Sequence, residues 1–264
     1  MTRWITGIIL ATFVTLMLFF APVAWGQIFV IILAALAAWE FFTLIGSDVR
    51  SRYFGAAFTV VGVNVILHRF EMSHLLAFFY MTLICGFLLK LALDAEPLRE
   101  RFNQVSYFCL GVFYLAVSFG CIGLLLTLPR AHFWVFLTLA STFLADTLAY
   151  IVGRKWGKRK LAPEISPGKT EEGFWGSLFG GVVGSVLVRQ LFWPEFNLPF
   201  VMLLGIVIAI LGVTGDLSES LIKRAFNAKD SGKIIPGHGG ILDRVDSVLF
   251  SAPVVYFLAV WLAK

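Results

Sequence analysis

Five acidic side chains lie in or beside apolar stretches in the second half of the chain: Asp146, Asp216, Glu219, Asp243 and Asp246. An ionisable group in such surroundings is costly and is therefore functional by default. Two pairs of these acids are three residues apart, and pairs at one level of a membrane can converge on a divalent cation. We therefore expect Asp216, Asp243 and Asp246 to bind a metal ion, with Asp146 and Glu219 as further candidates. For any one acid, a helix cap or a salt bridge is the alternative.

The first acid pair belongs to a predicted helix with one polar face. Positions three or four apart lie on the same side of a helix. The spacing therefore predicts a polar stripe that descends from the membrane and consists of Asp216, Glu219, Ser220 and Lys223.

Glycine and basic residues dominate the stretch between the two acid pairs. The basic residues 223–233 lead into Gly237, Gly239 and Gly240, which surround His238. Glycine lets backbone N–H groups approach a ligand closely, and a following helix start can cradle phosphate oxygens. Mg²⁺ takes one or two carboxylates and completes its shell with phosphate oxygens and water, while Lys and Arg hold the remaining charge. The composition is thus typical of a site for Mg²⁺ and a polyphosphate.

A second polar loop, at residues 154–172, is also a candidate for anion binding. Lys169 and the hydroxyl groups of Ser166 and Thr170 are suitable phosphate ligands. Residues 168–170 resemble the end of a P-loop, but Pro163 stands where that motif requires glycine and no buried strand precedes it. A P-loop is therefore excluded, and an ordinary basic loop beside the membrane is the alternative.

Membrane-spanning helices are the elements expected to position these residues. Of 264 residues, 59% are hydrophobic and 14% charged, whereas a soluble domain has roughly 25% charged residues. This excludes a soluble globule, a disordered chain and a lone membrane anchor. About 20 apolar residues cross a bilayer as a helix. The apolar runs predict an all-α, polytopic integral membrane protein with about nine transmembrane helices, at residues 5–21, 23–45, 53–67, 74–93, 105–128, 132–153, 173–193, 198–219 and 245–263.

The basic residues predict the orientation of these helices. With a cytoplasmic N-terminus, most Lys and Arg residues fall on the cytoplasmic side, as the positive-inside rule requires. That side includes the two polar loops, at residues 154–172 and 220–244. The basic residues behind the net charge of +5 are thus expected to face anionic lipid headgroups, and the charge does not indicate nucleic-acid binding.

The two halves of the chain differ in polarity. Residues 1–130 carry almost no polar motif, which favours a scaffold, a lipid-facing bundle or a dimerising region. A homodimer is therefore one of the assemblies that the sequence allows. The lone acid in this half, Glu40, is expected to make an interhelical hydrogen bond. Residues 131–264 form the predicted catalytic region. There, small residues at Gly176, Gly180 and Gly184 predict close helix packing. The cysteines, Cys85, Cys109 and Cys121, lie in apolar spans and predict no disulfide or zinc site.

The stretch from Ser220 to Asp246 resembles the signature of the phosphatidate cytidylyltransferases. The loop at residues 165–173 and the segment 215–219 also resemble parts of that family, so the likeness covers residues 140–250. The matching signature positions are Ser220, Lys223, Arg224, Lys229, Asp230, Gly232, Pro236, His238, Gly239, Gly240, Asp243, Arg244 and Asp246.

This resemblance implies an enzyme of phospholipid biosynthesis that uses Mg²⁺. It would convert CTP and phosphatidate into CDP-diacylglycerol and pyrophosphate in a bacterial-type inner membrane, with its active site facing the cytoplasm. A second cation is compatible with this chemistry.

The predicted roles follow from the chemistry of each side chain. Candidates for catalysis are Asp216, Lys223, Arg224, His238, Asp243, Arg244 and Asp246. Candidates for substrate binding are Ser166, Lys169, Thr170, Ser220, Lys229, Gly239 and Gly240. His238 is a donor to the leaving pyrophosphate or a structural residue of the turn, and both interpretations stay open.

Two other functions compete with this interpretation. A CTP-dependent lipid kinase would use a similar site but would release CDP instead of pyrophosphate. An ion-coupled transporter would use Asp146 and Glu40 as relay groups, although the acids cluster at one edge of the membrane rather than at its midplane.

Overall fold

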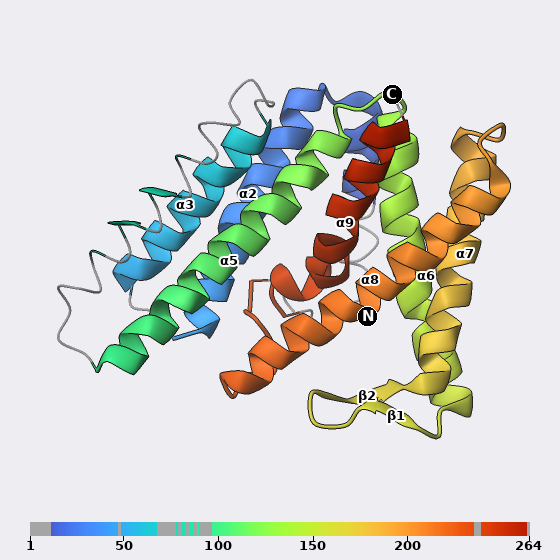
Figure 1. Ribbon diagram of the computed structural model, residues 1–264. Coiled ribbons are helices and arrows are strands. Elements are labelled where there is room, and N and C mark those ends of the chain that lie inside the picture. The colour runs from blue at the N-terminus through green and yellow to red at the C-terminus, as the bar shows by residue number, and fades with distance from the viewer. Residues whose placement is uncertain are drawn as a thin grey trace.

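The protein is a bundle of long helices with one small β-hairpin (Figure 1). The computed structural model describes residues 12–46, 49–67, 97–234 and 239–262, together with positions 78, 81, 82, 85, 86 and 89. Its bounded elements are α2 (Val23–Leu44), α3 (Val49–Leu67), α5 (Leu98–Leu125), α6 (Ala131–Trp156), β1 (Lys160–Ala162), β2 (Ser166–Thr170), α7 (Glu171–Phe192), α8 (Leu198–Ala225) and α9 (Leu242–Leu262).

The fold class predicted from the sequence is confirmed. In the described part of the chain, six helices are long and apolar enough to cross a membrane, namely α2, α5, α6, α7, α8 and α9. The predicted span at residues 74–93 and the start of the span at 5–21 lie largely outside the described residues, so the count of nine stays a prediction. Large apolar side chains such as Trp175, Phe179 and Leu191 are exposed on α7, as expected for a surface that faces lipid.

The glycine ridge of α7 packs closely against α6, as its spacing predicted. A methyl group added at Gly176, Gly180 or Gly184 would collide with α6, mostly with its backbone. On another side of α7, Gly181 meets Gly205 of α8 just as closely. Small residues therefore bring three helices into direct backbone contact.

The hairpin β1–β2 was not predicted from the sequence. The strands pair antiparallel within residues that were expected to form a loop, and Lys160 lies opposite Thr170. Thr170 ends the hairpin and caps α7, because its hydroxyl oxygen accepts a hydrogen bond of 3.1 Å from the Gly173 N–H. The hairpin therefore leads into α7 without an intervening loop.

The polar segments meet at one end of the bundle because successive helices alternate in direction (Figure 1). We call this the polar end: α2, α6 and α8 finish there, α5, α7 and α9 begin there, and the hairpin lies beside them. Helix α8 continues to Ala225, beyond the predicted boundary at 219. Ser220 and Lys223 lie on its last turns, as the predicted polar stripe requires, and Arg224 is helical as well, so the loop expected at 220–244 begins later.

Candidate active site

The hairpin and α8 meet through Lys169. Its Nζ lies 2.9 Å from Oδ2 of Asp216, and both side chains are largely shielded from solvent. On the last turn of α8, Arg224 donates from Nε to the backbone oxygen of Ile165, at 3.4 Å. The two polar loops singled out in the sequence are therefore adjacent, as a shared site requires.

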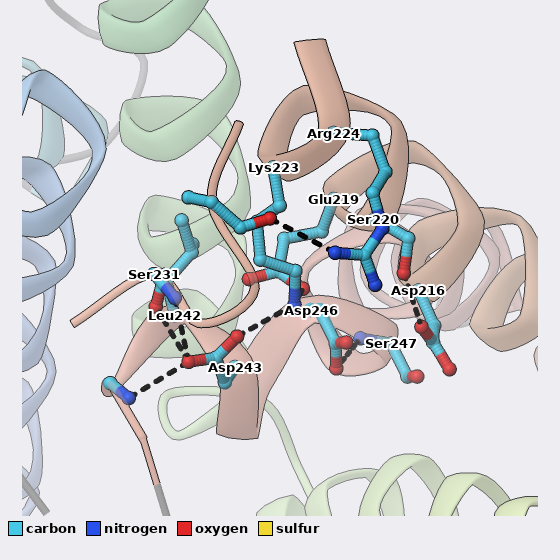
Figure 2. Close-up of polar contacts among 12 residues, drawn as sticks. Asp216, Glu219, Ser220, Lys223, Arg224, Ser231, Leu242, Asp243, Asp246 and Ser247 are labelled. Atoms are coloured by element: carbon cyan, nitrogen blue, oxygen red, sulfur yellow. Dashed lines mark hydrogen bonds and ion pairs between the residues drawn. The ribbon is translucent and has the colours of Figure 1, made fainter. Parts of the chain in front are cut away.

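The predicted polar stripe on α8 is present. Ser220 donates from its hydroxyl group to Asp216 Oδ1, at 3.3 Å, and Lys223 pairs with Glu219 one turn before it. Glu219 is 2% exposed. The Lys223 ammonium group also lies 2.7 Å from Oδ1 of Asp243 on α9, which ties α8 to the start of α9 (Figure 2).

Asp243 is the centre of a hydrogen-bond network. Its Oδ2 accepts from the backbone N–H of Ser231 at 2.9 Å, from the Ser231 hydroxyl group at 3.0 Å and from the Gly240 N–H at 2.8 Å (Figure 2). The same Ser231 hydroxyl group lies 3.3 Å from Oε2 of Glu40 on α2, so its one hydrogen is shared between Asp243 and Glu40. We call Glu40, Glu219, Lys223, Ser231 and Asp243 the loop network.

Three other carboxylates gather where α6, α8 and α9 approach one another. Asp146, Asp216 and Asp246 are half-buried and close enough for their charges to interact. We call them the aspartate group. Asp246 accepts a hydrogen bond from the Ser247 N–H at 2.7 Å (Figure 2). Among the described residues, the ion pairs involve neither Asp146 nor Asp246.

The aspartate group fits Mg²⁺ better than Asp243 does. Within the described residues, no three His, Cys, Asp or Glu side chains are close enough to hold a metal by themselves. Mg²⁺ needs only one or two protein carboxylates when phosphate oxygens complete its shell, and Asp216 and Asp246 supply that number. Asp243 already accepts four hydrogen bonds, from Lys223, Ser231 and Gly240. Asp216 contacts only Lys169 and Ser220 in the described structure, and Asp246 accepts from the Ser247 N–H. Metal binding itself stays a prediction.

The remaining predicted site residues lie around these two groups. Ser166 is half-buried on β2, Lys229 and Arg244 are exposed, and Gly239 and Gly240 lie just before α9. Gly239 has φ +83°, a conformation that favours glycine. His238 lies outside the described residues, so its predicted part in catalysis stays open.

Sequence reasoning missed the link between Glu40 and the loop. It predicted an interhelical hydrogen bond, and this is confirmed, since Glu40 Oε2 accepts from the N–H of Leu242, the first residue of α9, at 2.9 Å. It did not connect Glu40 or Ser231 with the site. Ser231 lies between two signature positions, Asp230 and Gly232. That place in the signature is the one feature of the sequence that could have pointed to Ser231 as part of the site.

Comparison with known proteins gives the family. The cytidylyltransferase family matches residues 1–262. The chain belongs to this family. The match includes both halves of the chain, and so it extends the likeness well beyond residues 140–250.

Individual members of the family are similar to this chain over different lengths. The phosphatidate cytidylyltransferase of Bacillus subtilis is 40% identical over 162 residues, which cover 60% of this chain and 59% of that protein. The one from Staphylococcus haemolyticus is 40% identical over 164 residues, or 61% and 62% of the two chains. The one from Synechocystis is 37% identical over 237 residues, or 77% and 78%. The chain thus spans about three fifths of the first two relatives and over three quarters of the third.

Proposed function

We propose that this family member is a phosphatidate cytidylyltransferase, which makes CDP-diacylglycerol and pyrophosphate from CTP and phosphatidate. Its similarity to relatives of that name supports the reaction. The observation that carries the proposal is the ion pair between Lys169 and Asp216. It joins the hairpin to the polar stripe on α8. Basic and acidic groups from both polar loops therefore surround one site at the polar end.

The proposed reaction requires neutralisation of the negative charges on both substrates rather than a strong base. A phosphate monoester has a second pKa of about 6, so phosphatidate is largely dianionic at pH 7. One of its oxygens forms a bond to the α-phosphorus of CTP, while the bond from that phosphorus to the bridging oxygen breaks and pyrophosphate leaves. The main obstacle is the repulsion between two polyanions, which cationic side chains reduce.

Lys169, Arg224 and Arg244 are the cations that we assign to phosphate groups. Arg224 and Arg244 are exposed at the polar end, where a nucleotide can reach them from water. Lys169 is held against Asp216 and would be released toward a phosphate when that carboxylate binds a metal. Asp216 and Asp246 would hold Mg²⁺, with Asp146 beside them. When bound, Mg²⁺ would supply Lewis-acid stabilisation of negative charge on the phosphate oxygens.

The position of the site supports lateral entry of the lipid. Asp146, Asp216 and Asp246 lie within or at the ends of helices that are apolar enough to cross a membrane, whereas the hairpin lies beyond those helices (Figure 1). Phosphatidate would keep its acyl chains in the bilayer and avoid an extraction cost of about 0.8 kcal/mol per CH₂ group. Residues 131–264 would carry the chemistry, and residues 1–130 would support it.

Isotope labelling tests the reaction. Purified protein in detergent receives phosphatidate, diacylglycerol as a lipid alcohol, Mg²⁺ and CTP labelled at either the α- or the γ-phosphorus. We expect the α-label in the lipid and the γ-label in pyrophosphate. Transfer of the γ-label to a lipid, with release of CDP, would identify a lipid kinase instead. No transfer of either label would contradict both enzymes.

Thiol labelling tests the proposed orientation, in which the site faces the cytoplasm of a bacterial-type inner membrane. Lys160 is exposed on β1. In a variant whose three native cysteines are replaced by serine, Lys160→Cys should react with an impermeant reagent only after the cytoplasmic side is opened. Labelling in intact cells would invert the orientation and separate the site from cellular CTP.

A further inference from the structure

Glu40 reaches the signature segment from the other half of the chain. It lies near the end of α2, is 3% exposed, and accepts hydrogen bonds from residues about 190 and 200 positions later in the sequence. A buried carboxylate is costly unless it is satisfied by partners. Its partners here are Ser231 and Leu242, which flank the part of the chain that contains Gly239 and Gly240.

Two glycines of this segment fit directly against the Glu40 carboxylate. A methyl group added at Gly232 or at Gly240 would collide with the carboxylate oxygens or carbon of Glu40. The chain therefore approaches Glu40 at two points, one on each side of the undescribed residues 235–238. A side chain at either point would displace the Glu40 carboxylate or the segment itself, and either change would break the contact between them.

The contacts continue from Glu40 into the candidate active site. The Ser231 hydroxyl group shares its hydrogen between Glu40 and Asp243, and Asp243 pairs with Lys223. A change at Glu40 would therefore reach Asp243 through Ser231 and through Leu242, the residue before it, and would reach Lys223 through Asp243.

We infer that Glu40 is a positioning residue that holds residues 231–234 and 239–242 at the polar end. It acts by accepting hydrogen bonds and by filling the space that Gly232 and Gly240 leave. Its effect on catalysis rests on the function proposed above, whereas its effect on the segment does not.

A spin label on the segment measures this effect without an activity assay. Lys233 is exposed, and Lys233→Cys in the cysteine-free protein accepts the label. We expect an immobilised spectrum with Glu40 present and loss of the immobilised component in Glu40→Ala. A label at Lys160→Cys on the hairpin should give the same spectrum in both proteins.

Two further variants of α2 separate hydrogen bonding from general packing. Glu40→Gln keeps a carbonyl acceptor and nearly the same volume, so it should retain the immobilised spectrum at position 233. Phe42 is fully buried on α2 and packs against Gly55 and Phe108. Phe42→Leu loosens the core but should leave the label at 233 immobilised. Mobility in Phe42→Leu equal to that in Glu40→Ala would overturn the inference.

A variant on the loop side keeps the test decisive if Glu40→Ala does not fold. Gly232→Ala places a methyl group against the Glu40 carboxylate and should also mobilise the label at 233. Gly168→Ala in the hairpin is the matched control, because a methyl group there meets nothing within 4 Å. An immobilised label in Gly232→Ala would contradict the role of Glu40.

Activity then connects the segment to the reaction. If the wild-type protein makes CDP-diacylglycerol, kcat should fall about tenfold in Glu40→Ala and recover in Glu40→Gln, as expected when a supporting contact misplaces reacting groups. An unchanged kcat in Glu40→Ala, with a mobile label, would remove the catalytic part of the inference. If the wild-type protein makes no CDP-lipid, the proposed function fails, and the spectra alone decide the role of Glu40.

Discussion

The aspartate group and the loop network lie at the same end of the bundle but are built differently. In the loop network every carboxylate has at least one partner: Asp243 and Glu219 share Lys223, and Glu40 accepts from Ser231 and Leu242 through Oε2. The other oxygen of Glu40 and of Glu219 is buried without a hydrogen-bond partner. In the aspartate group, only Asp216 forms an ion pair among the described residues, with Lys169. Asp146 and Asp246 repel Asp216 and have no ion pair among the described residues, whereas Lys223 lies between Glu219 and Asp243 and offsets their repulsion.

This difference separates structural acids from acids prepared for a ligand. A buried carboxylate that already pairs with a lysine, as Asp243 and Glu219 do, has less to gain from a metal than one without an ion pair. Several half-buried carboxylates that repel one another gain free energy when a cation arrives. We therefore assign the loop network to the shape of the site and the aspartate group to its chemistry. Of the three acids that the sequence predicted to bind a metal, Asp216 and Asp246 are therefore better candidates than Asp243.

The largest expected effect is on turnover when the aspartate group loses a charge. Asp246→Asn should lower kcat by about 100-fold or more, because a metal-binding carboxylate is removed. The apparent melting temperature in detergent should stay within error of wild type, since Asp246 makes no ion pair in the described structure. The matched control is Glu164→Gln, which removes an exposed acid from the hairpin. Near-normal turnover of Asp246→Asn at saturating Mg²⁺ would mean that Asp246 is a helix cap and not a metal ligand.

The same substitution in the loop network should affect stability first. Asp243→Asn leaves Lys223 with one anionic partner where it had two. Breaking a buried ion pair lowers the free energy of unfolding by about 3 kcal/mol. We expect a clear fall in the melting temperature, accompanied by lower activity. A variant that is as stable as wild type but inactive would instead indicate that Asp243 takes part in the chemistry. The proposed difference between the loop network and the aspartate group would then be wrong.

Lys169 joins the two polar loops, and its loss should produce an intermediate effect. Lys169→Ala should raise the KM of one phosphate-bearing substrate about tenfold, or about 1.4 kcal/mol of binding free energy. It should leave the dependence on Mg²⁺ in place. Lys160→Ala removes an exposed lysine from the neighbouring strand and serves as the control. Unchanged KM values for both substrates in Lys169→Ala would restrict the site to residues 215–246.

The smallest expected effect belongs to Ser231. Ser231→Ala removes two hydroxyl contacts, to Glu40 and Asp243, but keeps the backbone N–H bond to Asp243. We expect a loss of about 1 kcal/mol in unfolding free energy and little change in KM. Ser106→Ala is a suitable control, because that exposed hydroxyl group donates to the Phe102 carbonyl oxygen one turn earlier on α5. A destabilisation equal to that of Asp243→Asn would mean that Ser231, rather than Asp243, centres the network.

Most of the fold could be predicted from the sequence because hydrophobicity determines it. The starts of α2, α6 and α8 agree closely with the predicted spans, and the spacing of small residues on α7 correctly predicted its packing against α6. The apolar span predicted to end at 219 fell short of the end of α8 because the last turns of that helix are polar. The hairpin was missed because Pro163, Pro167 and Gly168 are typical of an irregular loop.

The candidate site could be predicted only in part. The helical spacing of Asp216, Glu219, Ser220 and Lys223 was sufficient to place them on one face, since that relation is local. Asp243 and Asp246 have the same three-residue spacing as Asp216 and Glu219, but their partners come from distant segments. Sequence spacing cannot show that Asp243 meets Ser231 or that Ser231 meets Glu40, because those contacts depend on how α2 and α9 pack.

Binding of Mn²⁺ in place of Mg²⁺ tests the central claim most directly. Electron paramagnetic resonance of purified protein with CTP measures bound Mn²⁺ without turnover. We predict that Asp246→Asn weakens Mn²⁺ binding about tenfold or more, equivalent to about 1.4 kcal/mol, while folded Asp243→Asn and Glu164→Gln bind it as wild type does. Wild-type affinity in Asp246→Asn, together with lost affinity in folded Asp243→Asn, would contradict the assignment of chemistry to the aspartate group.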